Sequence, residues 1–292
     1  MRAIGFSEYK DRQKLRELLM DVILHADRRD STTNQEHVLI GEFSKEFADG
    51  LGITVCGEFD EANKFSYDYY YPFLRGRGIT TQEDVSVERH ADKESYAGVC
   101  DDLQVGISMI FYLQNFIPYM DAQNAKQLPI LGTSLTLSAL SISASIMMPI
   151  QKDEMQQIQK RIEAANRSML IDAAKKGDEA AIETLTMEEM DIYTTVSRRV
   201  LKEDVYSLVD TYFMPFGVEC DQYSILGEIT QVREVKNERT KEKLYLLTVS
   251  CNELTFDVSI NIIDLFGEPQ VGRRFKGIIW LQGHINYPLR SM

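Results

Sequence analysis

The 292 residues suffice for one large domain or two ordinary ones, and a hydrophobic content of 44% excludes a globally disordered chain. The formal net charge of -13 opposes the counterion release that drives nucleic-acid binding, and it also opposes docking on anionic lipid. The acidity is concentrated in residues 1–217, which makes nucleic acid an unexpected partner for that part of the chain, whereas residues 218–292 are nearly neutral.

The first elements in chain order are one helix and a series of strands. The leucine spacing predicts a helix from Glu8 to Ala26 with Ser7 as its N-cap, and the polar run Asp27 to Asn34 predicts a loop. Alternating apolar residues predict strands over His37–Phe47, Leu51–Phe59, Phe65–Leu74, Val85–Arg89, Ser95–Cys100 and Val105–Leu113. Short turns join these strands, which favours an antiparallel sheet of about seven strands.

Residues 127–151 carry no charge and allow two interpretations. A helix of this length could span a bilayer. A strand from Thr133 to Met148 is favoured, because Leu140, Ile142 and Ile146 alternate with serines, and because seven Ser or Thr hydroxyls suit a lipid-facing helix poorly. We expect this strand to close the sheet. Its apolar parity changes between residues 139 and 140, which predicts a β-bulge there.

From Lys152 onward, the spacing of apolar residues has the period of a helix. Gly177 is expected to end the first of these helices, and Asp178 to cap the next. A capping-box pattern starting at Thr186 predicts a further helix to about Leu201. A short helix is predicted over Asp204–Phe213, because a proline and a glycine follow it.

The last segment returns to alternating patterns, and these predict four long strands: Tyr223–Val235, Leu244–Cys251, Leu254–Ile262 and Arg273–Ile285. Such a set favours a small β-barrel of the OB or SH3-like kind. We therefore predict an α+β protein with two domains. Residues 1–216 form the first, with the antiparallel sheet to about residue 149 and the helical segment over 150–216, and residues 217–292 form the barrel.

Five aromatic residues in the strand Phe65–Leu74 share one parity. One interpretation is an aromatic platform for a sugar, peptide or base, with Tyr67, Tyr69 and Tyr71 as ligand-binding candidates. The alternative is a half-buried sheet face whose rings cover the core. The second interpretation is favoured, because Asp68 belongs to the opposite, more polar face.

The last strand contains the single tryptophan. Trp280 shares a strand face with Arg274 and Lys276, an arrangement that could stack bases or sugars on a barrel. In the alternative interpretation, Trp280 packs against the preceding helices and the two cations are solvated, and this interpretation is favoured. These three residues remain candidates for ligand binding.

No pattern typical of a cofactor or metal site is present. Cys56, Cys100, Cys220 and Cys251 are widely spaced, so neither a zinc site nor a disulfide framework is indicated, and no cofactor is expected. Reduced thiols and the polar segment that follows Arg2 favour a cytoplasmic protein. No catalytic motif is recognised either, so catalytic residues stay unknown.

Two stretches resemble a known family. The opening run Arg2–Ser7 is similar to the start of an uncharacterised protein family of clostridial Firmicutes. The run Phe213–Tyr223, followed by Leu226–Ile229, resembles the junction between helices and barrel in that family. Its members have a similar length, so the resemblance implies one relationship for the whole chain. It implies no activity and no functional residue.

Three functions are compatible with these observations. The first is a binding or scaffold protein without catalysis, with a protein or small ligand as partner, no membrane contact, and room for a homo-oligomer. The second is a hydrolase-type enzyme whose acidic residues and His90 converge only in three dimensions. The third is a barrel that binds single-stranded nucleic acid or an oligosaccharide. The first is favoured, because both β-rich parts lack a catalytic cluster in sequence.

Overall fold

The computed structural model describes residues 1–34, 36–89, 95–102, 107–130, 132–149, 166–167, 169–187 and 209–288. The fold is mixed α+β, as predicted, with one four-stranded antiparallel sheet and one closed five-stranded barrel. The chain divides into two compact units, residues 1–147 together with 212–292, and residues 148–211. Residues on both sides of position 216, where the sequence predicts a domain boundary, belong to strands that pair within the first unit.

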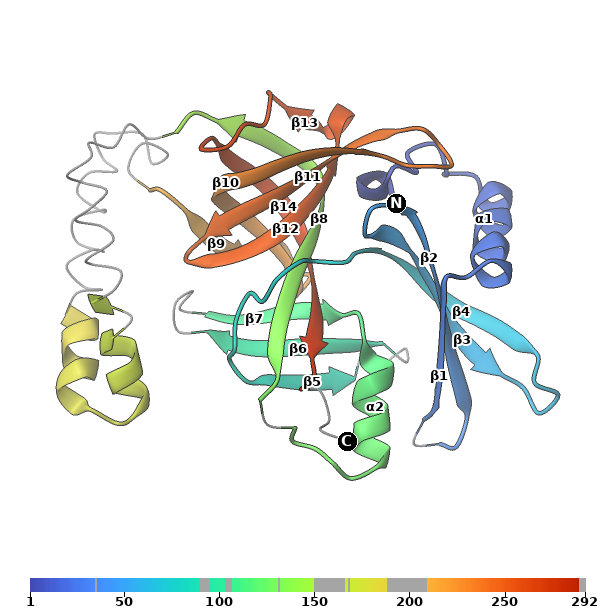
Figure 1. Cartoon of the computed structure of the whole chain (residues 1–292), viewed down its shortest axis with the longest axis horizontal. Helices are drawn as coiled ribbons and strands as arrows, with labels where there is room; N and C mark the ends of the chain where they lie inside the picture. Colours follow the sequence, from blue (N-terminus) through green and yellow to red (C-terminus); the bar gives the residue numbers. More distant parts are fainter. Residues whose placement is uncertain are drawn as a thin grey trace. The chain divides into compact units, whose positions relative to one another are not determined.

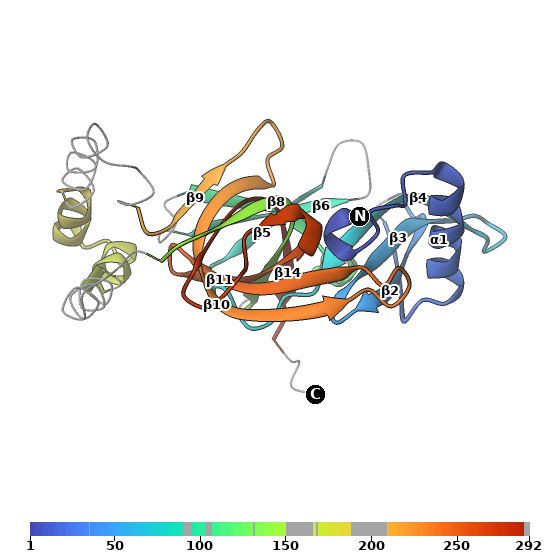
Figure 2. The ribbon, with the colours of Figure 1, turned by 90° about the horizontal axis from the view of Figure 1, so that it is seen from above.

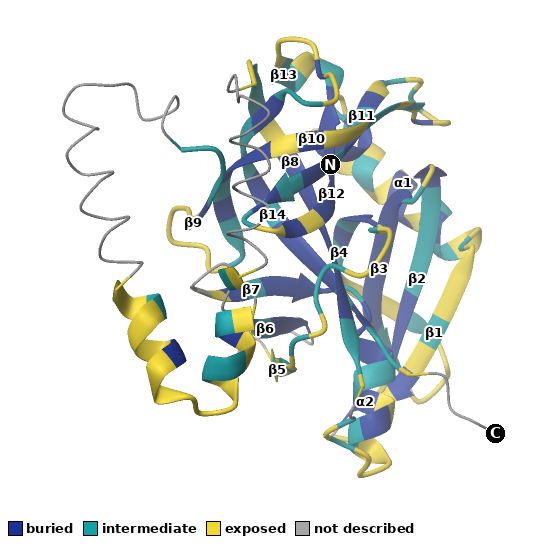
Figure 3. Cartoon of the chain, turned by 60° about the vertical axis from the view of Figure 1, so that its left-hand side comes forward, coloured by how far each residue is buried: buried dark blue, intermediate teal, exposed yellow. Residues whose placement is uncertain are grey.

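The four-stranded sheet has the order β1–β2–β3–β4 (Figure 1). Its strands are β1 (Arg28–Thr33), β2 (Leu39–Ala48), β3 (Leu51–Phe59) and β4 (Phe65–Leu74). The bounds predicted for β3 and β4 are confirmed. The predicted loop over residues 27–34 is wrong, since β1 pairs with β2 along six residues. This edge strand is largely exposed (Figure 3), so it needs no apolar alternation.

Helix α1 (Arg12–Leu24) is shorter than the helix predicted from residue 8. Asp11, not Ser7, is its N-cap, because the Asp11 carboxylate accepts hydrogen bonds from the backbone of Gln13 and Lys14 at 2.7 and 3.1 Å. The Ser7 hydroxyl donates to Glu242 instead, at 2.8 Å. The buried face of α1 packs on β2 and β3, and Figure 2 shows the helix beside this sheet.

Five strands close the barrel. They are β8 (Ser134–Met147), β10 (Gln222–Lys236), β11 (Lys243–Cys251), β12 (Leu254–Asn261) and β14 (Arg274–Asn286). Antiparallel pairing joins β10 to β11, β11 to β12, and β10 to β14. The ring closes through β8, which is antiparallel to β14 and parallel to β12. The short elements η2 (Ile262–Asp264) and β13 (Leu265–Phe266) connect β12 to β14.

The neutral segment is therefore a strand, as predicted, but its expected position was wrong. It closes the barrel, not the N-terminal sheet, because β12 and β14 leave open edges that only a further strand can satisfy. The bulge lies at Ile142, where the register with β14 shifts, and not between residues 139 and 140. Within the described residues, no helix has the length and apolar character needed to cross a membrane.

The hydroxyl groups of β8 have specific acceptors. Ser138 donates to the carbonyl of Leu74 at 2.6 Å, and Ser141 donates to the carbonyl of Ile278 at 2.8 Å. Both serines are buried. These two serines lie on opposite faces of the strand, and each hydroxyl binds a neighbouring backbone segment, because a buried hydroxyl needs a hydrogen-bond partner.

Three strands extend the barrel sheet. They are β5 (Val85–Arg89), β6 (Tyr96–Asp102) and β7 (Ile107–Leu113), and β7 pairs in parallel with the end of β14. Helix α2 (Phe116–Asn124), which the sequence analysis did not predict, follows β7. Its apolar side chains Phe116, Ile117 and Met120 are buried, so tertiary packing stabilises this short helix.

The smaller unit contains helical residues 169–175 and 179–187 in its described part. Gly177 has a φ of 85°, and the Asp178 carboxylate accepts a hydrogen bond from the Ala180 backbone at 3.0 Å, so the predicted helix end and cap are confirmed. Thr186 lies inside a helix instead of capping a new one, since its hydroxyl donates to the Ile182 carbonyl.

Two further helix predictions concern residues 150–165 and 188–208, which lie outside the described residues. The prediction of a helix over Asp204–Phe213 is wrong at its C-terminal end. Residues Tyr212–Pro215 form strand β9, which pairs with β10, because Phe213 enters the apolar core of the first unit.

The N-terminal segment, with the short helix η1 (Arg2–Ile4), packs on part of the outer face of the barrel. Ile4 and Phe6 belong to one buried cluster with Leu244 and Leu246 of β11. Barrel side chains also bind the backbone of this segment: Asn237 donates to the Ile4 carbonyl at 2.8 Å. Apolar contacts and backbone hydrogen bonds therefore act at the same surface.

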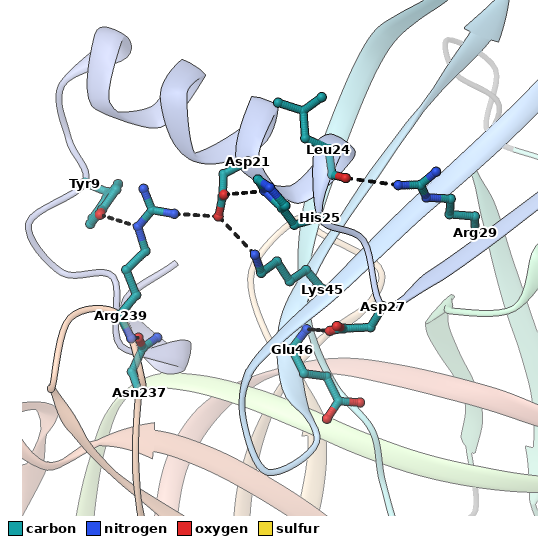
Figure 4. A network of polar contacts seen from close by, with 10 residues as sticks. All are labelled: Tyr9, Asp21, Leu24, His25, Asp27, Arg29, Lys45, Glu46, Asn237 and Arg239. Carbon is teal, nitrogen blue, oxygen red and sulfur yellow. Dashed lines mark hydrogen bonds and ion pairs between the residues drawn. The ribbon is translucent and has the colours of Figure 1, made fainter.

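A polar network connects this surface to α1 and β2 (Figure 4). Asp21 accepts hydrogen bonds from Arg239, His25 and Lys45 at 2.7, 2.8 and 3.2 Å. Partial desolvation alone would raise the pKa of Asp21, but the contacts with Lys45 and His25 outweigh it and lower this pKa below its usual range. Arg239 also donates to the hydroxyl of Tyr9 at 3.2 Å. One carboxylate thus joins three elements.

Replacing Asp21 by Asn removes this charge, and we expect it to lower the free energy of unfolding by about 1 kcal/mol at pH 7. Because the stabilisation from a lowered pKa is complete above the unfolded-state value of about 4 and is lost as the pH falls through the lower folded-state value, the difference from wild type should shrink progressively below pH about 4. Urea denaturation at several pH values measures this. The matched control is Glu17→Gln on the exposed side of α1. A pH-independent difference would contradict the charge interpretation.

Candidate functional site

The aromatic candidates lie along β4 with increasing burial. Tyr67 is 38% exposed, Tyr69 is half-buried, and Tyr71 is buried. Strand register places Cys56 opposite Tyr69 and Gly57 opposite Tyr67, so Asp68 is an extra residue between them. The structure therefore gives these rings different surroundings, and only the Tyr67 ring is substantially open to solvent among the three.

The tryptophan candidate lies in the wall of the barrel. Trp280 is half-buried, its indole N–H donates to Asp221 at 2.6 Å, and its ring lies 5.3 Å from that of Tyr112. Arg274 is buried and Lys276 is half-buried. These three residues share β14, as predicted, but they do not form a row of exposed side chains.

A second set of residues comes together on the inner face of the four-stranded sheet. Cross-strand register aligns Asp30, Glu42, Cys56 and Tyr69 in one row. The next row holds Arg28, Ser44, Thr54 and Tyr71. This face meets β7, α2 and the end of β14 rather than solvent. We call these two rows and their contacts the polar layer.

Glu42 is the most deeply buried carboxyl of the polar layer, with 6% of its surface exposed. Its Oε1 lies 3.5 Å from the Cys56 sulfur and 3.4 Å from the Tyr71 hydroxyl, which also donates to the Gln114 carbonyl at 3.2 Å. Burial is the main cause that raises the pKa of Glu42 to about 8. This carboxyl is therefore protonated at neutral pH.

A small polar cavity of about 30 Å³ adjoins Glu42. Its lining includes Arg28, Arg75 and His284. Burial, followed by the charges of the two arginines, lowers the pKa of His284 to about 4, so the imidazole is neutral. A cavity of this size holds about one or two waters and no organic substrate.

The thiol of this layer is unsuited to nucleophilic catalysis. Burial, together with the charge of Glu42, raises the pKa of Cys56 well above its ordinary value. A protonated, buried thiol is a poor nucleophile. The hydroxyl of Tyr112 is also buried and lacks a hydrogen bond of normal geometry, although the Tyr69 hydroxyl is close enough to affect its pKa.

A larger cavity lies on the opposite face of strand β14, near the C-terminal end of that strand. It has a volume of about 670 Å³, within the range of small-molecule sites. Strands β5 and β6, helix α2, the residues before β8 and the end of the chain after β14 form its walls. Its apolar lining comes from Val85, Val87, Val99, Leu128, Pro129 and Ile285. We call it the apolar cavity.

Two tyrosines also line the apolar cavity, Tyr119 from α2 and Tyr287 after β14. The Tyr287 hydroxyl oxygen is buried, and within the described part of the chain no hydrogen-bond partner reaches it. Burial, then the neighbouring Tyr119, raises the pKa of Tyr287, so this hydroxyl is a neutral donor. An unpaired buried hydroxyl costs free energy unless a ligand or water satisfies it.

Strand β14 separates the two cavities. His284 lines the polar cavity and Ile285 lines the apolar one, as the two-residue period of a strand requires. The side chain of Asn115 holds the backbone of β14 at Ile285, because it donates to the Ile285 carbonyl at 2.8 Å and accepts from the Ile285 amide at 3.0 Å. The wall between the cavities is thus held by two hydrogen bonds.

The sequence analysis did not identify Glu42 or Tyr287. Glu42 shares its strand parity with the buried Ile40, and this is the signal that could have identified a buried carboxyl. Tyr287 follows the last strand and carries no local signal. The acid/base candidate His90 lies outside the described residues. Across the part of the chain that the structure describes, no three His, Cys, Asp or Glu side chains are grouped to hold a metal ion.

Comparison with known proteins gives one match. A family model described as "Domain of unknown function, E. rectale Gene description (DUF3881)" matches residues 1–283. No curated protein and no solved structure matches the chain. The match agrees with the resemblance to an uncharacterised clostridial family, and it assigns no role to any residue.

The buried carboxyl makes stability depend on pH. The pKa of Glu42 is about 8 in the folded protein against an ordinary value of 4.5, so the folded state binds the extra proton between these values and loses stability as the pH rises through them. At about 1.4 kcal/mol per pKa unit, the full loss is on the order of 5 kcal/mol. Glu42→Gln should abolish this part of the pH dependence.

Urea denaturation at pH 5.5, 7 and 8.5 measures this prediction. The free energy of unfolding of the wild type should fall by several kcal/mol from pH 5.5 to 8.5. That of the Glu42→Gln variant should change little over the same range, because it lacks the titrating carboxyl. Glu61→Gln, at an exposed turn, is the control and should follow the wild type. Parallel curves for the wild type and Glu42→Gln would show that this carboxyl is already charged at low pH.

Proposed function

Because the chain belongs to the DUF3881 family, whose description assigns no function, we propose from its cavities that it is a binding protein without catalysis, and that its ligand is a small molecule with an apolar body. The ligand occupies the apolar cavity. The single observation that carries this proposal is a largely apolar space of about 670 Å³, lined by side chains from several separate segments of the chain.

The rigidity of the walls supports this proposal. Antiparallel pairing holds β5 to β6, and the two hydrogen bonds from Asn115 fix Ile285. A preformed site avoids much of the ordering cost of binding. The chemistry of the polar layer supports the absence of catalysis, because Cys56 is protonated and the adjoining space of about 30 Å³ is too small for a substrate.

The strand order of the barrel supports an OB-like assignment, with β10, β11 and β12 as its first three strands. OB barrels bind oligonucleotides and oligosaccharides on the outer face of the second and third strands. Here that face is occupied, since Leu244 and Leu246 pack against Ile4 and Phe6. We therefore favour the apolar cavity over a nucleic-acid site that includes Trp280. The cytoplasmic location and a homo-oligomer stay predictions from the sequence.

Binding of the neutral fluorophore N-phenyl-1-naphthylamine tests this function. We expect saturable fluorescence enhancement with one site per chain. Val99→Trp, which places a large side chain in the apolar cavity, should weaken binding at least about tenfold, because it removes the volume that the probe needs. The matched control Val218→Trp lies at a 99% exposed position and should bind like the wild type.

Thermal unfolding of both variants establishes that they are folded. Absence of saturable binding to the wild type, or equal affinity in Val99→Trp, would overturn the proposed function.

A further inference from the structure

The apolar cavity has an unusual charge distribution. Two carboxylates line it, those of Asp84 and Asp101, and both residues are exposed. No lysine, arginine or histidine lines it among the residues that the structure describes. An exposed rim of one charge sign raises the local concentration of ligands of the opposite sign.

Strand register brings the two carboxylates to the same end of one ladder. Val85 of β5 pairs with Cys100 of β6, and Asp84 precedes Val85 while Asp101 follows Cys100. The two acidic residues therefore lie directly beyond the last paired position at this end of the ladder. Like charges at one end of a hairpin repel each other, and a bound cation would reduce this repulsion.

The two tyrosine rings of the apolar cavity also favour a cationic ligand. Tyr119 and Tyr287 both line it, and they are close enough that Tyr119 affects the ionisation of Tyr287. Aromatic rings attract organic cations through their electron-rich faces. Valines and Ile285 provide the surface for an apolar body. The cavity thus combines an apolar interior, two aromatic rings and an acidic rim.

We infer that the ligand of the apolar cavity is an amphipathic organic cation, an amine or quaternary ammonium compound with a short hydrocarbon or aromatic body. This inference rests on the proposed function and names the ligand class of the same site. The hydrocarbon body fills the apolar interior, and the ammonium group lies at the rim beside Asp84 and Asp101. Fatty acids and other amphipathic anions of the same size are disfavoured by the same carboxylates.

Three probes with the same eight-carbon body test this inference: octylammonium, 1-octanol and octanoate at pH 7.5. Each competes with N-phenyl-1-naphthylamine for the wild-type full chain. We expect octylammonium to displace the fluorophore at about tenfold lower concentration than octanoate, with octanol between them. Raising the salt concentration to about 0.5 M should narrow this difference, because the rim is exposed.

The double variant Asp84→Asn with Asp101→Asn should bring octylammonium to the affinity of octanol and leave octanol unchanged. The matched control, Glu17→Gln with Glu61→Gln, removes the same total charge from exposed positions elsewhere and should keep the preference. Fluorophore binding that all three probes displace equally would overturn the inferred ligand class alone. Failure of the wild type to bind the neutral fluorophore would overturn the proposed function and this inference together.

Discussion

Closure of the barrel by β8 is the constraint on which the rest of the structure depends. This strand pairs with β14 along almost its whole length and with β12 in parallel. Without it, two strand edges would be left with unpaired backbone groups. Its serines also bind the chain that leaves β4, as Ser138 does at Leu74. One strand from the first half of the chain thus fixes the second half and the adjoining sheet together.

The pleat of β14 has a functional consequence. Because successive side chains point to opposite faces, His284 and Ile285 line two cavities of opposite character. The polar layer keeps Glu42 protonated through burial, whereas the apolar cavity is lined mainly by valine, leucine, isoleucine and proline side chains. The first arrangement has little free space. The second has space for a small molecule, and for this reason the proposed ligand is assigned there.

Sequence patterns predicted strands in which apolar and polar residues alternate. The hairpin of β3 and β4 is of this kind, and its bounds were correct. Strand β1 was missed because its polar residues lie at a sheet edge and show no alternation. The candidate site was harder still. Trp280 and Tyr71 were rightly noticed as distinctive, but both contact residues from distant parts of the chain. The apolar cavity, built from several separate segments, has no continuous signal.

The sequence by itself determined the conformation of residues 134–147, since alternation of apolar and hydroxyl side chains has a two-residue period whatever surrounds it. Only the tertiary structure decided which strands that segment joins and therefore where the walls of both cavities lie. The physical reason is that periodicity is a local property of the backbone. Pairing depends instead on which hydrogen-bonding edges remain open elsewhere in the fold, here those of β12 and β14.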